Sequence, residues 1–221
     1  MQAGLDAVNI SLDTLDKEKY KQVTGFDKLS VVLASITKAV ESGIPVKINA
    51  VLQKGMNEEE WLQLIQLAKN LPLSVRFIEM MPIGYGKDFQ FRGESEICEI
   101  LEKAYGRMTP IKERYGNGPC HYYDVDGFSG KIGFISAVSH KFCGECNRIR
   151  LTSQGFLKTC LQYAAGRDLR EVIRSGGSDE VLKAVILEAL AEKPDGHVFG
   201  GGLEKQKDDK TEKLCMAQIG G

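Results

Sequence analysis

Strands and helices alternate through the first part of the chain, and this alternation limits the folds available to it. Segments rich in β-forming residues, with alternating apolar and polar side chains, occur at 8–13, 46–52 and 75–81. Apolar residues at helical spacing fill the intervening segments, 27–42 and 57–70. Gly43 is a common helix stop, and Asn57 is a favourable N-cap for the second helix. Strands alternating with helices are typical of βαβ units, so the sequence predicts parallel strands.

Each of these strands also carries a polar face, which is unusual for a parallel sheet covered on both sides. Side chains alternate with a period of two along a strand, so the polar residues of each strand share one face. They are Asn9, Ser11 and Asp13 in the first strand, Lys47 and Asn49 in the second, and Glu79 with Met81 in the third. Edge or rim positions would explain some of them. A wet barrel interior that holds a charged ligand would explain all of them, by analogy with sites at barrel mouths.

Three such strands cannot close a barrel, and the first one lies only a few residues after Met1. We therefore expect the chain to begin in the middle of an α/β domain. The composition changes after Pro82, where a Gly-Tyr-Gly sequence is typical of a linker. The expected organisation is the back half of an incomplete barrel at 1–83, followed by an α+β domain at 84–221.

The second domain is expected to combine helices with short hairpins. Helical spacing occurs at 95–105, 168–174 and 178–192, and strand patterns occur at 121–125, 131–136, 149–152 and 155–159. Three consecutive glycines at 200–202 open a charged tail, which we expect to be mobile.

Charge and composition exclude several classes of protein. The chain carries 29 Lys and Arg against 30 Asp and Glu, a formal charge of -1, whereas a general nucleic-acid binder usually has a basic excess. No apolar run approaches the roughly 20 residues that span a bilayer. No secretory signal is recognisable, so the cytoplasm is the expected location. In that reducing compartment, clustered thiols indicate metal ligands or redox groups more often than disulfides.

The most specific motif is a C-x-x-C pair, Cys143 and Cys146, with Cys160 following after 13 intervening residues. A C-x-x-C turn lets two sulfurs face one metal, and the hairpin that follows can return a third. A structural zinc normally takes four ligands, and His140 or Cys120 could supply the fourth. Three thiolates on a four-iron cluster would instead leave one iron open. The spacing leaves zinc and iron-sulfur both possible.

Two arginines follow this motif at once. Arg148 and Arg150 stand at alternate positions of an expected strand and should therefore point the same way. Two guanidiniums beside a metal site suit an anionic ligand such as a phosphate, which arginine can bind with two parallel hydrogen bonds. The alternative is an exposed strand face with solvated charges.

The segment 142–161, FCGECNRIRLTSQGFLKTCL, closely resembles the C-terminal iron-sulfur domain of the radical S-adenosylmethionine GTP 3',8-cyclases of molybdenum cofactor biosynthesis. The resemblance covers the whole chain, including 8–15, 46–55, 76–82 and the Ile-Gly-Gly terminus. It implies the back half of an incomplete (β/α)6 TIM-like radical S-adenosylmethionine barrel, followed by an α+β iron-sulfur domain.

The resemblance also implies an activity, the conversion of GTP into 3',8-cyclo-7,8-dihydro-GTP on the way to molybdopterin. A [4Fe-4S] cluster in the barrel would cleave S-adenosylmethionine, and the resulting radical would abstract the ribose 3' hydrogen of GTP. A second [4Fe-4S] cluster, held by Cys143, Cys146 and Cys160, would bind the guanine through its open iron.

Residues that match the family's motifs take on implied roles. Ser11 and Met81 would contact S-adenosylmethionine. Lys47 would contact the GTP phosphates, and Arg148 with Arg150 would line the GTP site.

Catalytic roles are implied for the same two arginines and for Gly220 and Gly221, because a tail without side chains can pass through a narrow space. The implied partners are GTP as substrate and cyclic pyranopterin monophosphate synthase, which would receive the product. A homodimer is also expected, with no nucleic acid and no membrane.

The chain departs from this family in one respect. The family's first cluster needs a C-x-x-x-C-x-x-C loop, and this sequence contains none. We therefore expect the chain as given to hold the GTP-side cluster without generating the radical itself. The alternative is a non-catalytic module that binds GTP or zinc.

Overall fold

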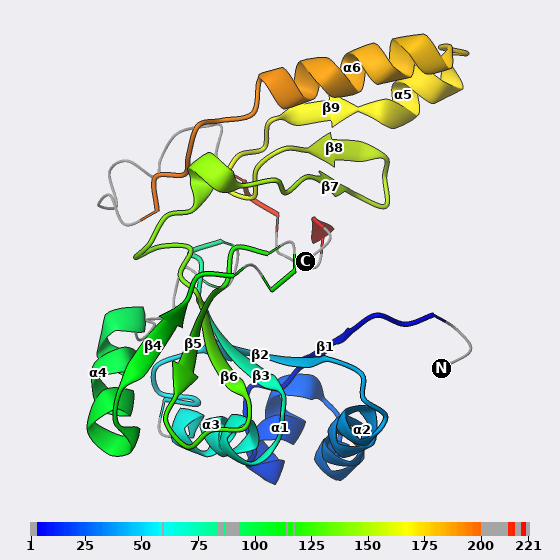
Figure 1. Cartoon of the computed structure of the whole chain (residues 1–221). Helices are drawn as coiled ribbons and strands as arrows, with labels where there is room; N and C mark the ends of the chain where they lie inside the picture. The colour runs from blue at the N-terminus through cyan, green and yellow to red at the C-terminus, as the bar shows by residue number, and fades with distance from the viewer. Residues whose placement is uncertain are drawn as a thin grey trace. The chain divides into compact units, whose positions relative to one another are not determined.

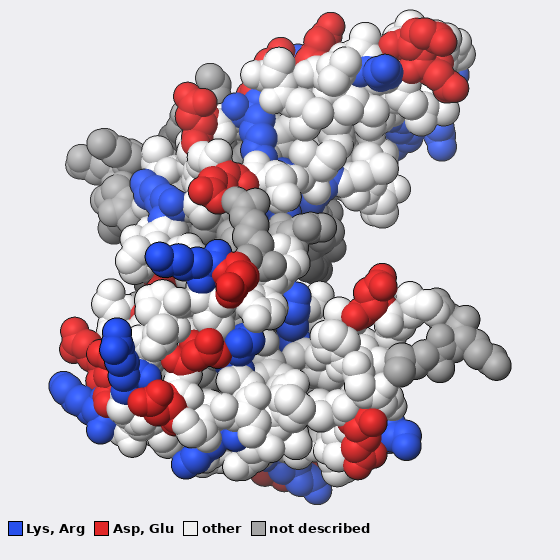
Figure 2. Space-filling view, viewed as in Figure 1, with Lys and Arg blue, Asp and Glu red and all other residues white. Residues whose placement is uncertain are grey.

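The chain forms two compact units in a computed structural model that describes residues 4–58, 60–83, 86, 93–113, 115–116, 118–199, 212–214 and 218–219. The first unit comprises Met1–Met80 and Phe89–His140, and the second comprises Met81–Asp88 and Lys141–Gly221. No helix in the described part of the chain is long and apolar enough to cross a membrane. On the face seen in Figure 2, acidic and basic side chains are interspersed, in keeping with the nearly balanced charge.

A six-stranded mixed sheet forms the centre of the first unit (Figure 1). Its spatial order is β1-β2-β3-β6-β5-β4, in which β1, β2, β3 and β6 are parallel while β5 is antiparallel to both neighbours. The strands are β1 Val8–Ser11, β2 Val46–Leu52, β3 Ser74–Glu79, β4 Met108–Ile111, β5 His121–Val125 and β6 Lys131–Ile135. The prediction of an α/β fold with parallel strands at the first three segments is confirmed.

Helices cover one face of this sheet. They are α1 Lys17–Thr24, α2 Leu29–Glu41, α3 Trp61–Asn70 and α4 Glu94–Tyr105. Along β2 every second side chain is buried, and Trp61 of α3 packs edge-on against Phe77 of β3, with ring centroids 6.1 Å apart. The buried side chains of β2 therefore face the helices, and the side chains between them lie on the polar face of the sheet.

Helix α1 was not anticipated from the sequence. Asp16 caps it by accepting a hydrogen bond from the Lys19 amide at 2.8 Å, and Gly25 ends it with φ of 77°. The helix is short and mostly polar, and only Tyr20 is buried, so its apolar periodicity is weak.

Asn57 was expected to cap α3, and this prediction is wrong, because the helix begins four residues later at Trp61. Asn57 is instead buried, with its amide donating to the carbonyls of Asp13 at 2.7 Å and Val51 at 2.9 Å. Its Oδ1 accepts from the Gln53 amide at 2.8 Å. One side chain thus satisfies three backbone groups at the ends of β1 and β2, more than a helix cap would.

Strand β6 decides where the compact units divide. It pairs in parallel with β3, from Ser74 opposite Lys131 to Ile78 opposite Ile135. The hairpin of β5 and β6 therefore belongs to the first unit, although the sequence placed it in the second domain. The boundary expected at residue 83 does not coincide with the boundary between the compact units.

A three-stranded antiparallel sheet and two helices form the second unit. The elements are the 3-10 turn η2 Cys143–Glu145, β7 Arg150–Leu151, β8 Phe156–Lys158, β9 Gly166–Asp168, α5 Leu169–Arg174 and α6 Asp179–Ala191. The expected hairpin of β7 and β8 is confirmed, and the Gly155 amide closes its turn on the Thr152 carbonyl at 2.9 Å. Leu157, Leu169 and Ala189 form the buried core between this sheet and its helices.

The C-terminal residues that the structure describes are held in place. Glu212 is 5% exposed and Ile219 is fully buried, so the expectation of a mobile tail is wrong for these positions. Residues 200–211, Gly220 and Gly221 lie outside the described residues.

Candidate functional site

The expected metal ligands all belong to the second unit, where Cys143 and Cys146 occupy one tight turn. The Cys146 amide donates to the Cys143 carbonyl at 3.1 Å, which gives the C-x-x-C segment its 3-10 geometry. Cys160 follows two residues after the end of β8. All three thiols are free and partly exposed, so none is committed to a disulfide.

Arg150 is the basic side chain whose pKa is affected by two of these thiols. It is half-buried at the start of β7, and Cys146 and Cys160 lie near enough for their charges to influence its pKa. Burial and the neighbouring Arg148 lower the pKa of Arg150, while the two thiols act in the opposite direction. A guanidinium stays protonated under all ordinary conditions, so this side chain places a permanent positive charge beside two of the three sulfurs.

The expected arrangement of the two arginines is correct only in part. Strand β7 begins at Arg150, so Arg148 lies in the preceding loop and is exposed. Strand alternation therefore does not fix the direction of Arg148. The charge of the Arg148 guanidinium nevertheless contributes to lowering the pKa of Arg150.

Lys193 secures the loop that carries Cys146, and sequence reasoning did not identify it. Its Nζ donates to the carbonyls of Cys146 and of Arg148, the second at 3.1 Å. Lys193 follows the last turn of α6, so the thiol loop is attached to the helix that covers the sheet. A basic residue just after a helix is a signal for such a contact, since lysine reaches carbonyl groups on a flexible stem.

The donor chemistry of this region fits a soft metal or an iron-sulfur cluster, because the second unit supplies three free thiols and the cationic side chain of Arg150. Within the described residues, however, no three His, Cys, Asp or Glu side chains are already arranged to hold a metal ion. The two proposed fourth ligands have other partners in the first unit. His140 Nδ1 lies 3.4 Å from a Glu94 carboxylate oxygen, and the Cys120 thiol contacts the His121 carbonyl at 3.6 Å.

A second candidate site lies on the polar face of the six-stranded sheet. Arg76 of β3 is largely buried, and its guanidinium donates to Asn49 Oδ1 at 2.7 Å and to Asn9 Oδ1 at 2.8 Å. Three adjacent strands thus supply one hydrogen-bonded row. A charge this buried needs polar partners, and a guanidinium carries five donors, so it can also bind an anion.

Lys47 extends this face along β2. Its Nζ donates to the Tyr115 carbonyl at 3.2 Å, and a Cβ at Gly116 would lie only 3.0 Å from that Nζ. Lys47 and Asn49 are two positions apart on β2, so they share the face that carries Arg76. The sequence predicted this shared polar face for β1 and β2, but it assigned no role to Arg76.

Tyr122 completes the row. Gly133 of β6 pairs with Arg76 on one side and with Tyr122 of β5 on the other. A Cβ at Gly133 would lie 2.6 Å from Cys120 Sγ, so glycine leaves space for that thiol and the tyrosine ring. The Tyr122 hydroxyl is buried beside Arg76 and Cys120, and no partner within the described residues meets the geometry of a hydrogen bond to it.

Other polar residues of these strands serve the fold instead. Asp13 accepts a hydrogen bond from the Val51 amide at 2.8 Å, and Glu79 accepts from the amides of Val138 at 2.7 Å and Ser139 at 2.9 Å. Ser11 is exposed at the end of β1. Met81 belongs to the second compact unit, so it is not brought together with Ser11 within one unit.

Two family models match the chain. The model described as the Radical SAM superfamily matches residues 1–68, and the model described as Molybdenum Cofactor Synthesis C matches residues 73–199.

Curated relatives named GTP 3',8-cyclase are similar over nearly the whole chain. The protein of Clostridium perfringens (strain 13 / Type A) is 46% identical over 218 residues, which are 99% of this chain and 66% of that protein. The protein of Syntrophomonas wolfei is 41% identical over 223 residues, covering 99% and 67% of the two chains. The chain thus spans about two thirds of the length of these relatives. The resemblance inferred from the sequence is confirmed, and the chain belongs to the Molybdenum Cofactor Synthesis C family.

Proposed function

We propose that the protein acts in molybdenum cofactor biosynthesis as a GTP 3',8-cyclase, of which this chain contributes the part that binds GTP. The product would be 3',8-cyclo-7,8-dihydro-GTP, which cyclic pyranopterin monophosphate synthase would then take up. The names of the relatives support the reaction, and the donor set of the second unit supports the binding role.

In the second unit, Cys143, Cys146 and Cys160 would hold a [4Fe-4S] cluster. A cluster with three protein thiolates supplies one iron that can accept a donor atom of a purine. Arg150 would offset the negative charge of the thiolates and attract the nucleotide, with Arg148 beside it. The observation that carries the proposal is the placement of the cysteines, with Cys143 and Cys146 in one tight turn and Cys160 two residues after the end of β8 in the same unit.

In the first unit, Lys47 and Arg76 would bind the phosphates. Arg76 is suited to this task because Asn9 and Asn49 already fix its direction, so little side-chain freedom is lost on binding. The unpartnered hydroxyl of Tyr122, next in the same row, would donate a further hydrogen bond. These residues would orient the nucleotide and replace part of its water shell.

The remaining roles follow the family resemblance. Ser11 and Met81 would contact S-adenosylmethionine, and Gly220 with Gly221 would reach toward the reacting ribose. The six-stranded sheet would be the back half of an incomplete (β/α)6 barrel whose other part carries the S-adenosylmethionine cluster. The intact protein would be a cytoplasmic homodimer.

Nucleotide binding to anaerobically purified protein tests this proposal. We expect about four irons per chain, and we expect Arg150→Met to weaken GTP binding about tenfold, the cost of one charged hydrogen bond. Arg167→Met is the matched control, because Arg167 lies on β9 of the same sheet and pairs with the exposed Glu192. Colourless protein with one zinc, or equal GTP affinity in both variants, would overturn the proposal.

A further inference from the structure

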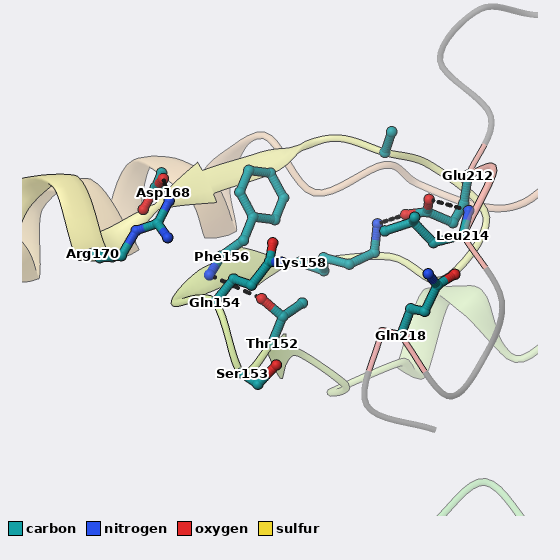
Figure 3. Close-up of a pocket in the computed structure, with 11 residues that line it drawn as sticks. Thr152, Ser153, Gln154, Phe156, Lys158, Asp168, Arg170, Glu212, Leu214 and Gln218 are labelled. Carbon is teal, nitrogen blue, oxygen red and sulfur yellow. Dashed lines mark hydrogen bonds and ion pairs between the residues drawn. The ribbon is translucent and has the colours of Figure 1, made fainter.

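A cavity of about 450 Å³ opens on one face of the three-stranded sheet (Figure 3). The opposite face is covered, because Leu157 of β8 packs with residues of α6. Phe156 and Lys158 flank Leu157 and therefore face the cavity. Its other lining residues include Asp168, Arg170, Glu212, Leu214 and Gln218. The last three come from the C-terminal end of the chain, which thus forms one wall.

Lys158 is buried in this cavity's floor, with only 3% of its surface exposed. Lysine is almost never so buried unless an opposite charge accompanies it. Its Nζ donates to the Glu212 carboxylate and to the Tyr163 carbonyl, the latter at 2.8 Å. Glu212 is 54 residues away in the sequence, so this ion pair joins β8 to the C-terminal wall.

Glu212 is equally well satisfied. Its second carboxylate oxygen accepts from the amides of Lys213 and Leu214, each at 2.9 Å, while its own amide donates to the Gln162 carbonyl at 2.6 Å. Gln162 is 1% exposed, and its Oε1 accepts from the Val198 amide at 2.7 Å. Every charge in this buried network has a partner, which is the condition for such a pair to order the chain around it.

A second ion pair at the same cavity, between Arg170 and Asp168, is exposed and serves as a comparison for the buried pair of Lys158 and Glu212. Arg170 Nη2 lies 3.1 Å from Asp168 Oδ2, two residues away on the same cavity wall. Both side chains are much more exposed than Lys158 and Glu212, and the contact is local in sequence. An exposed local pair contributes little and joins no distant segments.

We propose that Lys158 and Glu212 form a latch that positions the C-terminal residues as a wall of this cavity. Lys158 is two residues from Cys160 in the sequence. Both latch residues are positioning residues, since neither needs to touch a reacting atom. The latch stands on the contacts above, whereas its importance for GTP turnover rests on the proposed function. Without the latch, Glu212–Leu214 would lose their ordered place over β8.

Hydrogen exchange of the intact protein, followed by mass spectrometry, tests the latch. We expect Glu212→Gln and Lys158→Met each to speed exchange of the peptide containing Leu214 about tenfold or more, because each removes the buried ion pair that holds this segment against β8. Peptides of α6 and of the six-stranded sheet should exchange as in the wild type. Arg170→Met is the matched control and should leave the Leu214 peptide unchanged, since it breaks only the exposed pair.

Equal acceleration in the control, or no acceleration in either latch variant, would overturn the proposal. A single variant that leaves one buried charge unpaired could fail to fold, so Lys158→Met/Glu212→Leu provides a second route. It removes both charges, and it should still speed exchange at Leu214; full protection there would also overturn the proposal.

A GTP turnover assay of the intact protein separates this proposal from the proposed function. With the latch broken, we expect kcat to fall about tenfold with little change in KM for GTP. A protein that neither binds nor converts GTP would disprove the proposed function and leave the exchange result standing. Faster exchange at Leu214 with unaltered turnover would disprove the positioning role alone.

Discussion

Arg76 Nε donates a hydrogen bond to Asn49 Oδ1 at 2.7 Å, so an amide on β2 sets the direction of a largely buried guanidinium on β3. We expect Asn49→Leu to cost about 1–3 kcal/mol of stability, because a buried donor loses its acceptor. GTP affinity should fall with it. Urea unfolding and calorimetric titration measure the two effects. Asn70→Leu, at the exposed end of α3, should change neither, and similar losses in both variants would contradict this account.

Replacing Cys160 by Ser should remove more than half of the iron, because a cluster held by two thiolates is bound poorly. Iron analysis of anaerobically purified protein measures this loss. Cys98→Ser is the control, since Cys98 is another partly exposed free thiol but lies on α4 of the first unit. Full iron content in the Cys160 variant would exclude Cys160 as a ligand.

Gly133→Ala should destabilise the first unit by about 1–3 kcal/mol, because the added methyl group would overlap the Cys120 thiol. Cys120→Ala in the same chain should recover part of the loss, since it removes the nearest atom. The Tyr122 ring, 3.1 Å from the new Cβ, would limit the recovery. Thermal unfolding of both single variants and the double variant gives the coupling. Strictly additive losses would show that the two residues do not collide.

Thiol reactivity should divide the cysteines into two groups. Burial raises the pKa of Cys120 to about 12, and burial together with the nearby carboxylates of Glu94 and Glu102 raises the pKa of Cys98 to about 12. Only about one thiol in 10 000 is then ionised at pH 8, and the thiolate is the reactive form. In iron-free protein, iodoacetamide should label Cys143, Cys146 and Cys160 well before these two.

Mass spectrometry of a labelling time course gives the individual rates. Labelling of Cys120 should accelerate about tenfold for each pH unit between 8 and 10, because its thiolate fraction rises in that proportion. Labelling of Cys120 at pH 8 as fast as Cys160 would contradict the burial that the structure shows.

Much of the fold could be predicted because its signals are local. The strand at 46–52, most of the strand at 74–79 and the hairpin around Gly155 follow from residue patterns within a few positions. The pairing of β3 with β6 could not be predicted, since it joins segments more than fifty residues apart and no local pattern records a parallel partner. For the same reason the sequence did not indicate that β6 belongs to the sheet of the first compact unit.

The candidate site divides in the same way. Cysteine spacing and the adjacent arginines were visible in the sequence, and the structure places Arg150 near two of the thiols. Lys193 and Glu212 were not visible, because each acts on a group far along the chain. Arg76 lies within the segment 76–82 that resembles the family, but only the row formed with Asn9 and Asn49 shows what its side chain does.

Strand β3 hydrogen-bonds to β2 on one side and to β6 on the other, yet the two family matches meet between residues 68 and 73, just before it begins. Cutting the gene at that junction would leave β2 with a bare edge in one product and β3 in the other. Each fragment would then expose unsatisfied backbone groups along that edge, so the segments matched by the two family models depend on each other for a complete sheet.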